Sequence, residues 1–319
     1  MASSRSIPAP GRFAAGISPT HGSDFGHLSK MTICTLLLLF ASIAAAQDPG
    51  HRPGAKKVLV IASMEGSDGI FNRQSQLTSL TAPRWQESKK LMTDDVNAVV
   101  DGLYAGGASD VVVLDAYDTG QAISTLDIHP KAMLLSGRPM TPTLEMNSSY
   151  AAVVFAGLPS MAGTEEGVLA ATYDFQSIHA IWVNGKPTGA IGARAMLAGR
   201  HKVPVIMMYG DEAACKELRA LTPEAECAVV KWGVGRGGKS LAHAAAVQLI
   251  REKARVAIDR AASVKPYQFD GPAEVKVQYT TAARVMIFRP MEGVKQIDAR
   301  TWSFQGKDIV DAWLKFGDF

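Results

Sequence analysis

Polar side chains follow several of the apolar segments in this sequence, and they could work together as metal ligands or as acid–base groups. These carboxylates and hydroxyls are Ser63, Glu65, Asp68, Asp115, Tyr117, Asp118, Glu165, Glu166 and Asp174. If the apolar segments are parallel strands, their carboxyl ends meet at one edge of a sheet, which is where open α/β sheets bind ligands. Oxygen donors suit a hard divalent ion such as magnesium, manganese or calcium. One interpretation is therefore an oxygen-ligand metal site.

Nitrogen donors show no matching pattern. The seven histidines are His21, His27, His51, His129, His179, His201 and His243. None has the HExxH or paired spacing of a zinc site, and none follows one of the apolar runs directly. The chain also has no GxSxG motif, which would place a nucleophilic serine on a strand-to-helix turn. We therefore expect no histidine at the ligand-binding edge of the sheet.

A glycine-rich segment matches a phosphate-binding loop in form. Residues Gly233–Ser240 read GVGRGGKS, which fits GxxxxGK[ST] between a predicted strand and a predicted helix. The alternative is a glycine-rich connection without chemistry. The segment follows a late strand, and no apolar strand ending in Asp lies downstream to hold magnesium. Nucleotide binding through Gly233–Ser240 is therefore the weaker interpretation.

Strand-like and helix-like segments alternate along the chain and must position these groups. The expected strands span residues 57–62, 110–114, 151–155, 180–183, 203–208 and 227–231. The expected helices span residues 84–105, 189–199, 211–221 and 240–262. This alternation predicts an α/β fold, a doubly wound and mostly parallel sheet with helices on both faces.

The organisation of the chain follows from its breaks in composition. A stretch with two prolines and a glycine, residues 265–272, separates the α/β region from two further strands and a closing helix. We predict an α/β domain over residues 57–262, preceded by a linker over 47–56. A small α+β C-terminal domain over 263–319 would serve oligomerisation.

The amino-terminal segment has the pattern of an export signal. Residues 32–46 form a short apolar run that ends in Ala44-Ala45-Ala46 and follows a weakly basic stretch. We predict a leader over residues 1–46, cleavage near Ala46, and a periplasmic or extracellular protein with no stable membrane anchor. Two readings stay open beside this one: a start at Met31, and a buried apolar helix of the fold.

The composition of the chain limits the classes of partner that it is expected to bind. The 319 residues are 47% hydrophobic and carry 33 Lys and Arg against 30 Asp and Glu, so the net charge is +3. That balance, with no basic run, argues against a nucleic-acid partner. Three cysteines are too few for a disulfide-stapled scaffold. After loss of the leader Cys215 and Cys227 remain, and they either pair or lie buried as thiols.

Short motifs recur through the chain in a fixed order. They are 63–66 (SMEG), 91–97 (LMTDDVN), Asp115, 129–130 (HP), 135–137 (LSG), 183–189 (VNGKPTG), 198–199 (AG), 203–205 (VPV) and 210–211 (GD). In this order and spacing the chain resembles the DppA-type zinc D-aminopeptidases, from about Lys57 to the C-terminal end. The resemblance implies a two-domain subunit in a ring-like decamer. A pair of zinc ions in its chamber would hydrolyse short peptides with an N-terminal D-residue.

The motifs that the resemblance aligns lack most of the implied metal ligands. Of the five ligand positions, Glu65 keeps its carboxylate, whereas the other four hold Ser63, Tyr117, Pro159 and Ala190. The position of the catalytic histidine falls at about Ala171. The resemblance therefore gives no catalytic residue in this chain and implies zinc by analogy alone.

The interpretation we favour is an exported homologue of these metallopeptidases, without the binuclear zinc site, that binds short peptides or cell-wall fragments. It would form a homo-oligomer, and it would hydrolyse peptides with altered chemistry or not at all. The alternatives are the hydrolase with a rebuilt oxygen-ligand metal site and the nucleotide-binding protein.

Overall fold

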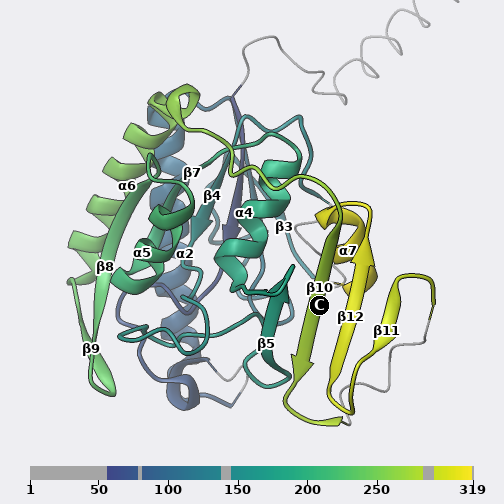
Figure 1. Cartoon of the computed structure of the whole chain (residues 1–319). Coiled ribbons are helices and arrows are strands. Elements are labelled where there is room, and N and C mark those ends of the chain that lie inside the picture. Colours follow the sequence, from purple (N-terminus) through teal and green to yellow (C-terminus); the bar gives the residue numbers. More distant parts are fainter. Residues whose placement is uncertain (1–55, 78–80, 138–144, 283–290, 318–319) are drawn as a thin grey trace, which may run out of the picture. The chain divides into compact units, whose positions relative to one another are not determined.

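A seven-stranded sheet forms the centre of the protein (Figure 1). The computed structural model describes residues 56–77, 81–137, 145–282 and 291–317. The strand order is β3-β2-β1-β4-β7-β8-β9. These strands span β1 Lys57–Ala62, β2 Asp110–Asp115, β3 Ala132–Leu135, β4 Ala152–Ala156, β7 Val205–Asp211, β8 Glu226–Val234 and β9 Gly237–Ser240. All neighbours pair in parallel except β8 with β9, which confirms the predicted mostly parallel sheet.

Helices cover both faces of this sheet. They are α2 Trp85–Ala105, α4 Ala190–Arg200, α5 Glu212–Leu221 and α6 His243–Asp259, with a π-helical turn η1 Arg73–Leu77 after β1 and a 3-10 turn η2 Ala261–Ser263 after α6. Alternate residues of β1 explain why: Leu59 packs with the α4 and α5 side chains, and Val60 packs with those of α2 and α6. Both faces of β1 are apolar and buried, as a central parallel strand requires.

A second sheet lies beside the first, with the strand order β11-β12-β10-β5-β6 (Figure 1). Its strands are β5 Ile178–Val183, β6 Lys186–Pro187, β10 Ala273–Tyr279, β11 Val294–Gln296 and β12 Thr301–Gly306, and helix α7 Ile309–Phe316 closes the chain. The placement of 180–183 in the parallel sheet was wrong, because β5 pairs antiparallel with β10. This sheet therefore joins residues from the middle of the chain to residues from its end.

The glycine-rich segment forms a hairpin and not a phosphate loop. Residues Gly233–Ser240 make up the end of β8, a tight turn and all of β9, with Gly233 opposite Gly238 and Lys231 opposite Ser240. The Ser240 hydroxyl accepts a hydrogen bond from the Gly69 N–H at 3.1 Å. A phosphate-binding loop leads from a strand into a helix and leaves its N–H groups facing a ligand. The predicted nucleotide site is therefore wrong.

The predictions about the leader, the linker, the domain limits and the two cysteines remain to be compared with the structure. The leader over residues 1–46 and most of the linker lie outside the described residues, so export stays a prediction, as do the domain limits. Within the described part of the chain, no helix has the length and apolar character needed to cross a bilayer. Cys215 and Cys227 are buried free thiols, and the Cys227 thiol donates to the Cys215 carbonyl at 3.7 Å.

Candidate functional site

Glu65 lies at the carboxyl end of β1 and is held by two neighbours. The Ser63 hydroxyl donates to Glu65 Oε2 at 2.6 Å. On the other side, Arg73 Nη1 lies 3.9 Å from Glu65 Oε1. The Glu65 side chain is 8% exposed, so this carboxylate sits out of water with a hydroxyl and a cation as partners. A buried charge needs such pairing to be tolerated.

The turn η1 and the segment after β4 fix Arg73 beside Glu65. Arg73 Nη2 donates to the carbonyl of Leu169, and to that of Ala170 at 3.3 Å. The guanidinium also lies 4.3 Å from the centre of the Phe175 ring, a cation–π contact. Arg73 could not be predicted from the sequence, because a single arginine in a segment without a motif gives no signal. The result is a fixed positive charge next to the carboxylate that the family resemblance singled out.

Tyr117 and Asp115 follow β2, as predicted, but each is engaged by the backbone. The Tyr117 hydroxyl donates to the Leu77 carbonyl, and burial together with the nearby Glu65 charge raises the pKa of this phenol far above its ordinary range. Asp115 accepts hydrogen bonds from the N–H of Tyr117 at 3.2 Å and of Ile123 at 2.8 Å. Burial raises the pKa of Asp115. Tyr117 therefore lines the site as a neutral group, and Asp115 holds the loop.

The remaining predicted oxygen ligands do not gather. Asp174 caps the turn at Gln176, and Glu165 and Glu166 line a separate pocket. Asp118 belongs to a turn with a left-handed backbone, φ 49°. Among the described residues, these four carboxylates therefore do not join the group of possible metal ligands.

A different group of metal-binding side chains does come together. Ligand atoms of Asp68, Asp95 and His243 all lie within 4.8 Å of one another. His243 Nδ1 lies 3.0 Å from Asp68 Oδ1, and its Nε2 lies 3.1 Å from Asp94 Oδ2. The expectation that no histidine reaches this edge is wrong for His243. It begins α6, which packs on α2, and no local sequence pattern reports that contact.

Lys231 supports the loop that carries Glu65 and Asp68. It is fully buried in β8, and its ammonium donates to the carbonyls of Glu65, Ser67 and Ile70 at 2.5, 2.8 and 2.7 Å. Burial lowers the pKa of Lys231 to about 8, against the opposing effect of nearby carboxylates. The loop after β1 is therefore shaped around a buried cation that its own carbonyls satisfy.

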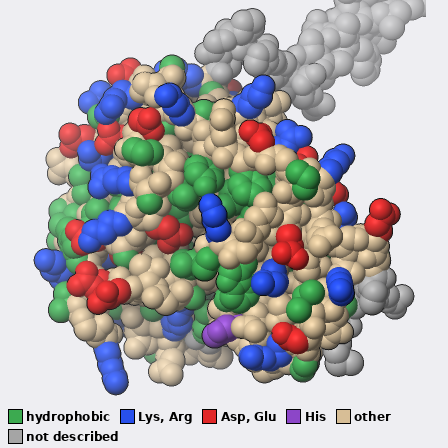
Figure 2. Space-filling model, in the orientation of Figure 1, with side chains coloured by type: hydrophobic (Ala, Val, Ile, Leu, Met, Phe, Trp, Pro, Cys, Tyr) green, Lys and Arg blue, Asp and Glu red, His purple; other side chains and the backbone are tan. Residues whose placement is uncertain are grey.

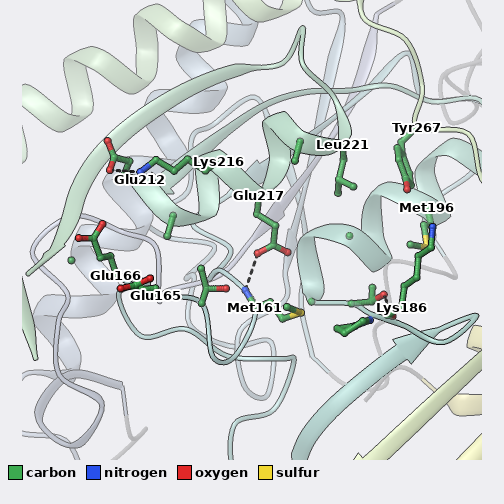
Figure 3. A pocket seen from close by; sticks show the side chains of 18 residues that line it. Met161, Glu165, Glu166, Lys186, Met196, Glu212, Lys216, Glu217, Leu221 and Tyr267 are labelled. Atoms are coloured by element: carbon green, nitrogen blue, oxygen red, sulfur yellow. Dashed lines mark hydrogen bonds and ion pairs between the residues drawn. The ribbon is translucent and has the colours of Figure 1, made fainter. Parts of the chain in front are cut away.

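A pocket of about 420 Å³ opens between α4, α5 and the loop after β4 (Figure 3). Glu165 and Glu166 lie at one side of it and Lys186 at the other, while Met196, Leu221 and Tyr267 add apolar surface. Glu217 lies between the two sides and accepts a hydrogen bond from the Met161 N–H at 2.8 Å. Burial raises the pKa of Glu217. The pocket therefore combines apolar lining with Lys186 at one side and, at the other, Glu165 and Glu166 together with the Glu212–Lys216 ion pair at 2.9 Å.

The surface around this region has no single dominant charge. Figure 2 shows acidic and basic side chains interspersed over the visible face, with hydrophobic side chains gathered near its centre. Such a face suits a small ligand that carries both charges better than a polyanion.

The fold and these groups together define an α/β protein with its site at the carboxyl edge of a parallel sheet, the usual position in such folds. The sequence profile of the M55 peptidase family, described as D-aminopeptidase, matches residues 56–316. The chain therefore belongs to the D-aminopeptidase family.

Two known proteins show how far the likeness extends. The D-aminopeptidase of Bacillus subtilis (strain 168) is 26% identical over 261 residues, which cover 81% of this chain and 94% of that protein. A solved structure from Bacillus subtilis, the Zn-dependent D-aminopeptidase DppA, described as a self-compartmentalizing protease, has a TM-score of 0.74 to this chain. It is 24% identical and the match covers 82% of this chain and 95% of that chain. The latter likeness shows the fold.

Proposed function

We propose that this chain is an exported, peptide-binding member of the D-aminopeptidase family in which the two-zinc chemistry has been lost or replaced. The observation that carries the proposal is the pairing of Glu65 with Arg73, at 3.9 Å. A zinc ion on Glu65 would sit beside a fixed guanidinium, and like charges at such distances repel strongly in a buried site.

The other inherited ligand positions add weight to this proposal. The resemblance puts ligands at Ser63, Tyr117, Pro159 and Ala190, of which proline and alanine offer no side-chain donor. The Ser63 hydroxyl is donated to Glu65, and the Tyr117 hydroxyl to Leu77. Zinc prefers imidazole, thiolate and carboxylate ligands, and one carboxylate already paired to arginine is a poor substitute.

The pocket of Figure 3 is the proposed peptide site. Its volume of about 420 Å³ falls in the range of small-molecule sites. A short peptide carries an ammonium at one end and a carboxylate at the other. Glu165 and Glu166 suit the ammonium, Lys186 suits the carboxylate, and the apolar surface between them suits side chains. D-residue peptides and cell-wall fragments are the ligand class.

Assembly and location complete the proposal. The solved Bacillus subtilis relative is a self-compartmentalizing protease. We propose a homo-oligomer for this chain too, with the C-terminal residues 263–319 at the contacts. The leader predicted over residues 1–46 supports export.

The test measures metal and activity on the same sample. Purified mature protein is assayed for bound metal and for hydrolysis of D-alanyl peptides, and peptide binding is followed by calorimetry. We expect binding of D-alanyl-D-alanine without chelator-sensitive turnover. Stoichiometric zinc at Glu65 together with turnover that a chelator abolishes would overturn the proposal.

A blocked variant locates the peptide. Ala220 is an exposed α5 residue that lines the pocket, so Ala220→Trp fills it with an indole. Ala105→Trp makes the same change at an exposed position at the end of α2, outside the pocket lining. Loss of binding in the first variant and retention in the second supports the site; equal affinity in both contradicts it.

A further inference from the structure

We propose that Asp68, Asp95 and His243 form a binding site for one divalent transition-metal ion, of the zinc or manganese kind. The site is separate from the positions at which the family resemblance puts ligands. It joins the loop after β1, the inner face of α2 and the first residue of α6.

The geometry already suits an ion. The three ligand atoms lie within 4.8 Å of one another, and His243 Nδ1 lies 3.0 Å from Asp68 Oδ1. Donors at about 2.0–2.2 Å from a tetrahedral zinc ion lie roughly 3.4 Å apart. Small shifts of the three side chains would therefore complete three contacts, and water would supply the rest.

The strongest observation is a buried oxygen of Asp95 that lacks a hydrogen-bond partner among the described residues. This carboxylate is fully buried, and its Oδ1 accepts no hydrogen bond from any residue that the structure describes. Its Oδ2 receives a long contact from the Asp68 N–H at 3.4 Å. An unpartnered buried carboxylate oxygen is costly, and here it faces a second buried carboxylate, Asp68, which is 2% exposed. A cation between them would remove both penalties.

Lys231, a buried cation close to this group, does not donate a hydrogen bond to Asp95. The three N–H groups of Lys231 are donated to the carbonyls of Glu65, Ser67 and Ile70. The ammonium attracts Asp68 and Asp95 through space, but it donates its hydrogen bonds to these carbonyls and not to either carboxylate. Two carboxylates and an imidazole therefore remain as donors with capacity for an ion.

His243 and Asp94 supply the outer part of the site. His243 is 35% exposed in its side chain, which leaves a path for an ion from solvent. In the bound state Nδ1 would coordinate the ion after releasing its proton to water, and Nε2–H would donate to Asp94 Oδ2, now 3.1 Å away. A carboxylate behind a metal-bound histidine fixes its tautomer and raises its basicity. One nitrogen and two oxygen donors favour zinc or manganese over calcium or magnesium.

The test uses the full mature protein, untagged and stripped with a chelator. Zn²⁺ and Mn²⁺ are titrated by calorimetry, and melting temperature is measured with each ion and with Ca²⁺ and Mg²⁺. We expect one ion per chain and a higher melting temperature with Zn²⁺ or Mn²⁺, because the ion binds the folded state. No binding and no shift with either ion would overturn the proposal.

Variants assign the ligands. Asp95→Asn and His243→Gln should each abolish the shift, and Asp94→Asn should weaken binding about 10- to 100-fold. The metal-free Asp95→Asn protein should melt no lower than the metal-free wild type, because a neutral amide does not repel the buried Asp68 carboxylate; a melting temperature in this range shows that the variant folds. A shift that survives in both Asp95→Asn and His243→Gln contradicts the site.

Two further variants separate this site from others. His129 forms a similar pair with Asp101, Nε2 to Oδ1 3.1 Å, so His129→Gln is the matched control and should bind the ion as the wild type does. Glu65→Gln should also bind normally. Binding that is lost in Glu65→Gln and kept in Asp95→Asn would place the ion at the inherited position and refute both this site and the proposed function.

Discussion

At the scale of single residues, the electrostatic environment of Glu65 depends on Arg73. Under the proposed function, Arg73 takes the place of a divalent ion beside the Glu65 carboxylate. Contacts with Leu169, Ala170 and Phe175 hold the guanidinium in position. The positive charge beside Glu65 would then belong to the chain itself, and a chelator could not remove it. Metal content and stability are therefore best measured together.

The Glu65–Arg73 pair can be measured by a double-mutant cycle with Glu65→Gln and Arg73→Leu. The Arg73 and Glu65 side chains are 20% and 8% exposed, so solvent screens the pair weakly. We expect a coupling of about 1–2 kcal/mol in the free energy of unfolding by denaturant. The exposed pair Arg251–Asp101, at 2.8 Å with side chains 57% and 38% exposed, is the control and should give less than about 0.5 kcal/mol. Equal couplings in the two cycles would show that Arg73 does not compensate Glu65.

Part of the candidate site at the sheet edge can be predicted from the residue types that follow the strands. Glu65, Asp68 and Tyr117 can be predicted because they lie in the loops that follow apolar strands, and the structure places them at the sheet edge. Arg73 and His243 could not be predicted, because each reaches the edge through a contact distant in sequence. His243 meets Asp68 across 175 positions, and that meeting depends on how α6 packs.

At the scale of elements, the packing of α2 on α6 brings Asp95 and His243 together. The two helices approach closely at Gly102, where a Cβ atom would lie 2.2 Å from the Arg251 carbonyl oxygen and 2.7 Å from Ala254 Cβ. Real Cβ atoms do not come so near to backbone, so the helices can keep this spacing with glycine alone. The position of His243 thus depends on a residue two turns away from the carboxylates.

Gly102→Ala should push the helices apart. We expect a loss of about 1–3 kcal/mol in the free energy of unfolding, since overpacking outweighs the better helix propensity of alanine. Gly192→Ala on α4 is the control: its nearest neighbour would be Thr188 Cγ2 at 3.3 Å, so its stability should change by less than about 1 kcal/mol. Denaturant titration checks both. A Gly102→Ala protein as stable as the control would show that the contact is loose.

Glu217 couples α5 to the loop after β4 and makes stability depend on pH. Burial raises its pKa in the folded state, so between its ordinary value and that raised value the folded protein holds more protons than the unfolded one. The contribution of this group is therefore present at pH 4 and is lost as the pH rises through the folded pKa.

Glu217→Gln keeps an acceptor for the Met161 N–H and removes the titration. We expect the variant to gain stability relative to the wild type between pH 4 and pH 7, measured by denaturant titration at each pH. Glu252→Gln, at an exposed position of α6, controls for the loss of one negative charge. A constant difference between Glu217→Gln and wild type across this range would contradict the argument.

At the scale of the whole molecule, local sequence patterns predict which segments form strands, but they do not predict which strands pair over long distances in the sequence. The continuous apolar runs of β1, β2, β4 and β7 predicted buried parallel strands, because burial on both faces leaves no polar alternation. The same kind of run in β5 was assigned to the wrong sheet. Which sheet a strand joins depends on its partner. The partner of β5, residues 273–279, lies between 92 and 101 positions later, counted from Val183↔Val275 to Ile178↔Tyr279.

The second sheet therefore tests whether residues 57–262 can stand alone as a domain. Truncation after residue 262 removes β10, β11, β12 and α7, and leaves β5 without the partner that pairs with it over Ile178–Val183. Ile181 and Val183 are each 1% exposed in the whole chain, and truncation would expose them on an unpaired edge. Exposed apolar edge strands promote association.

We expect the truncated chain to aggregate or to lose its cooperative thermal transition, followed by size-exclusion chromatography and circular dichroism. A chain that begins at residue 47 and keeps its C-terminus is the control, and should melt cooperatively. The C-terminal residues then belong to the core that holds the pocket and would serve assembly as an added role. A truncated chain that stays soluble and unfolds cooperatively would show instead that residues 263–319 form an appendage, free to act in oligomer contacts alone.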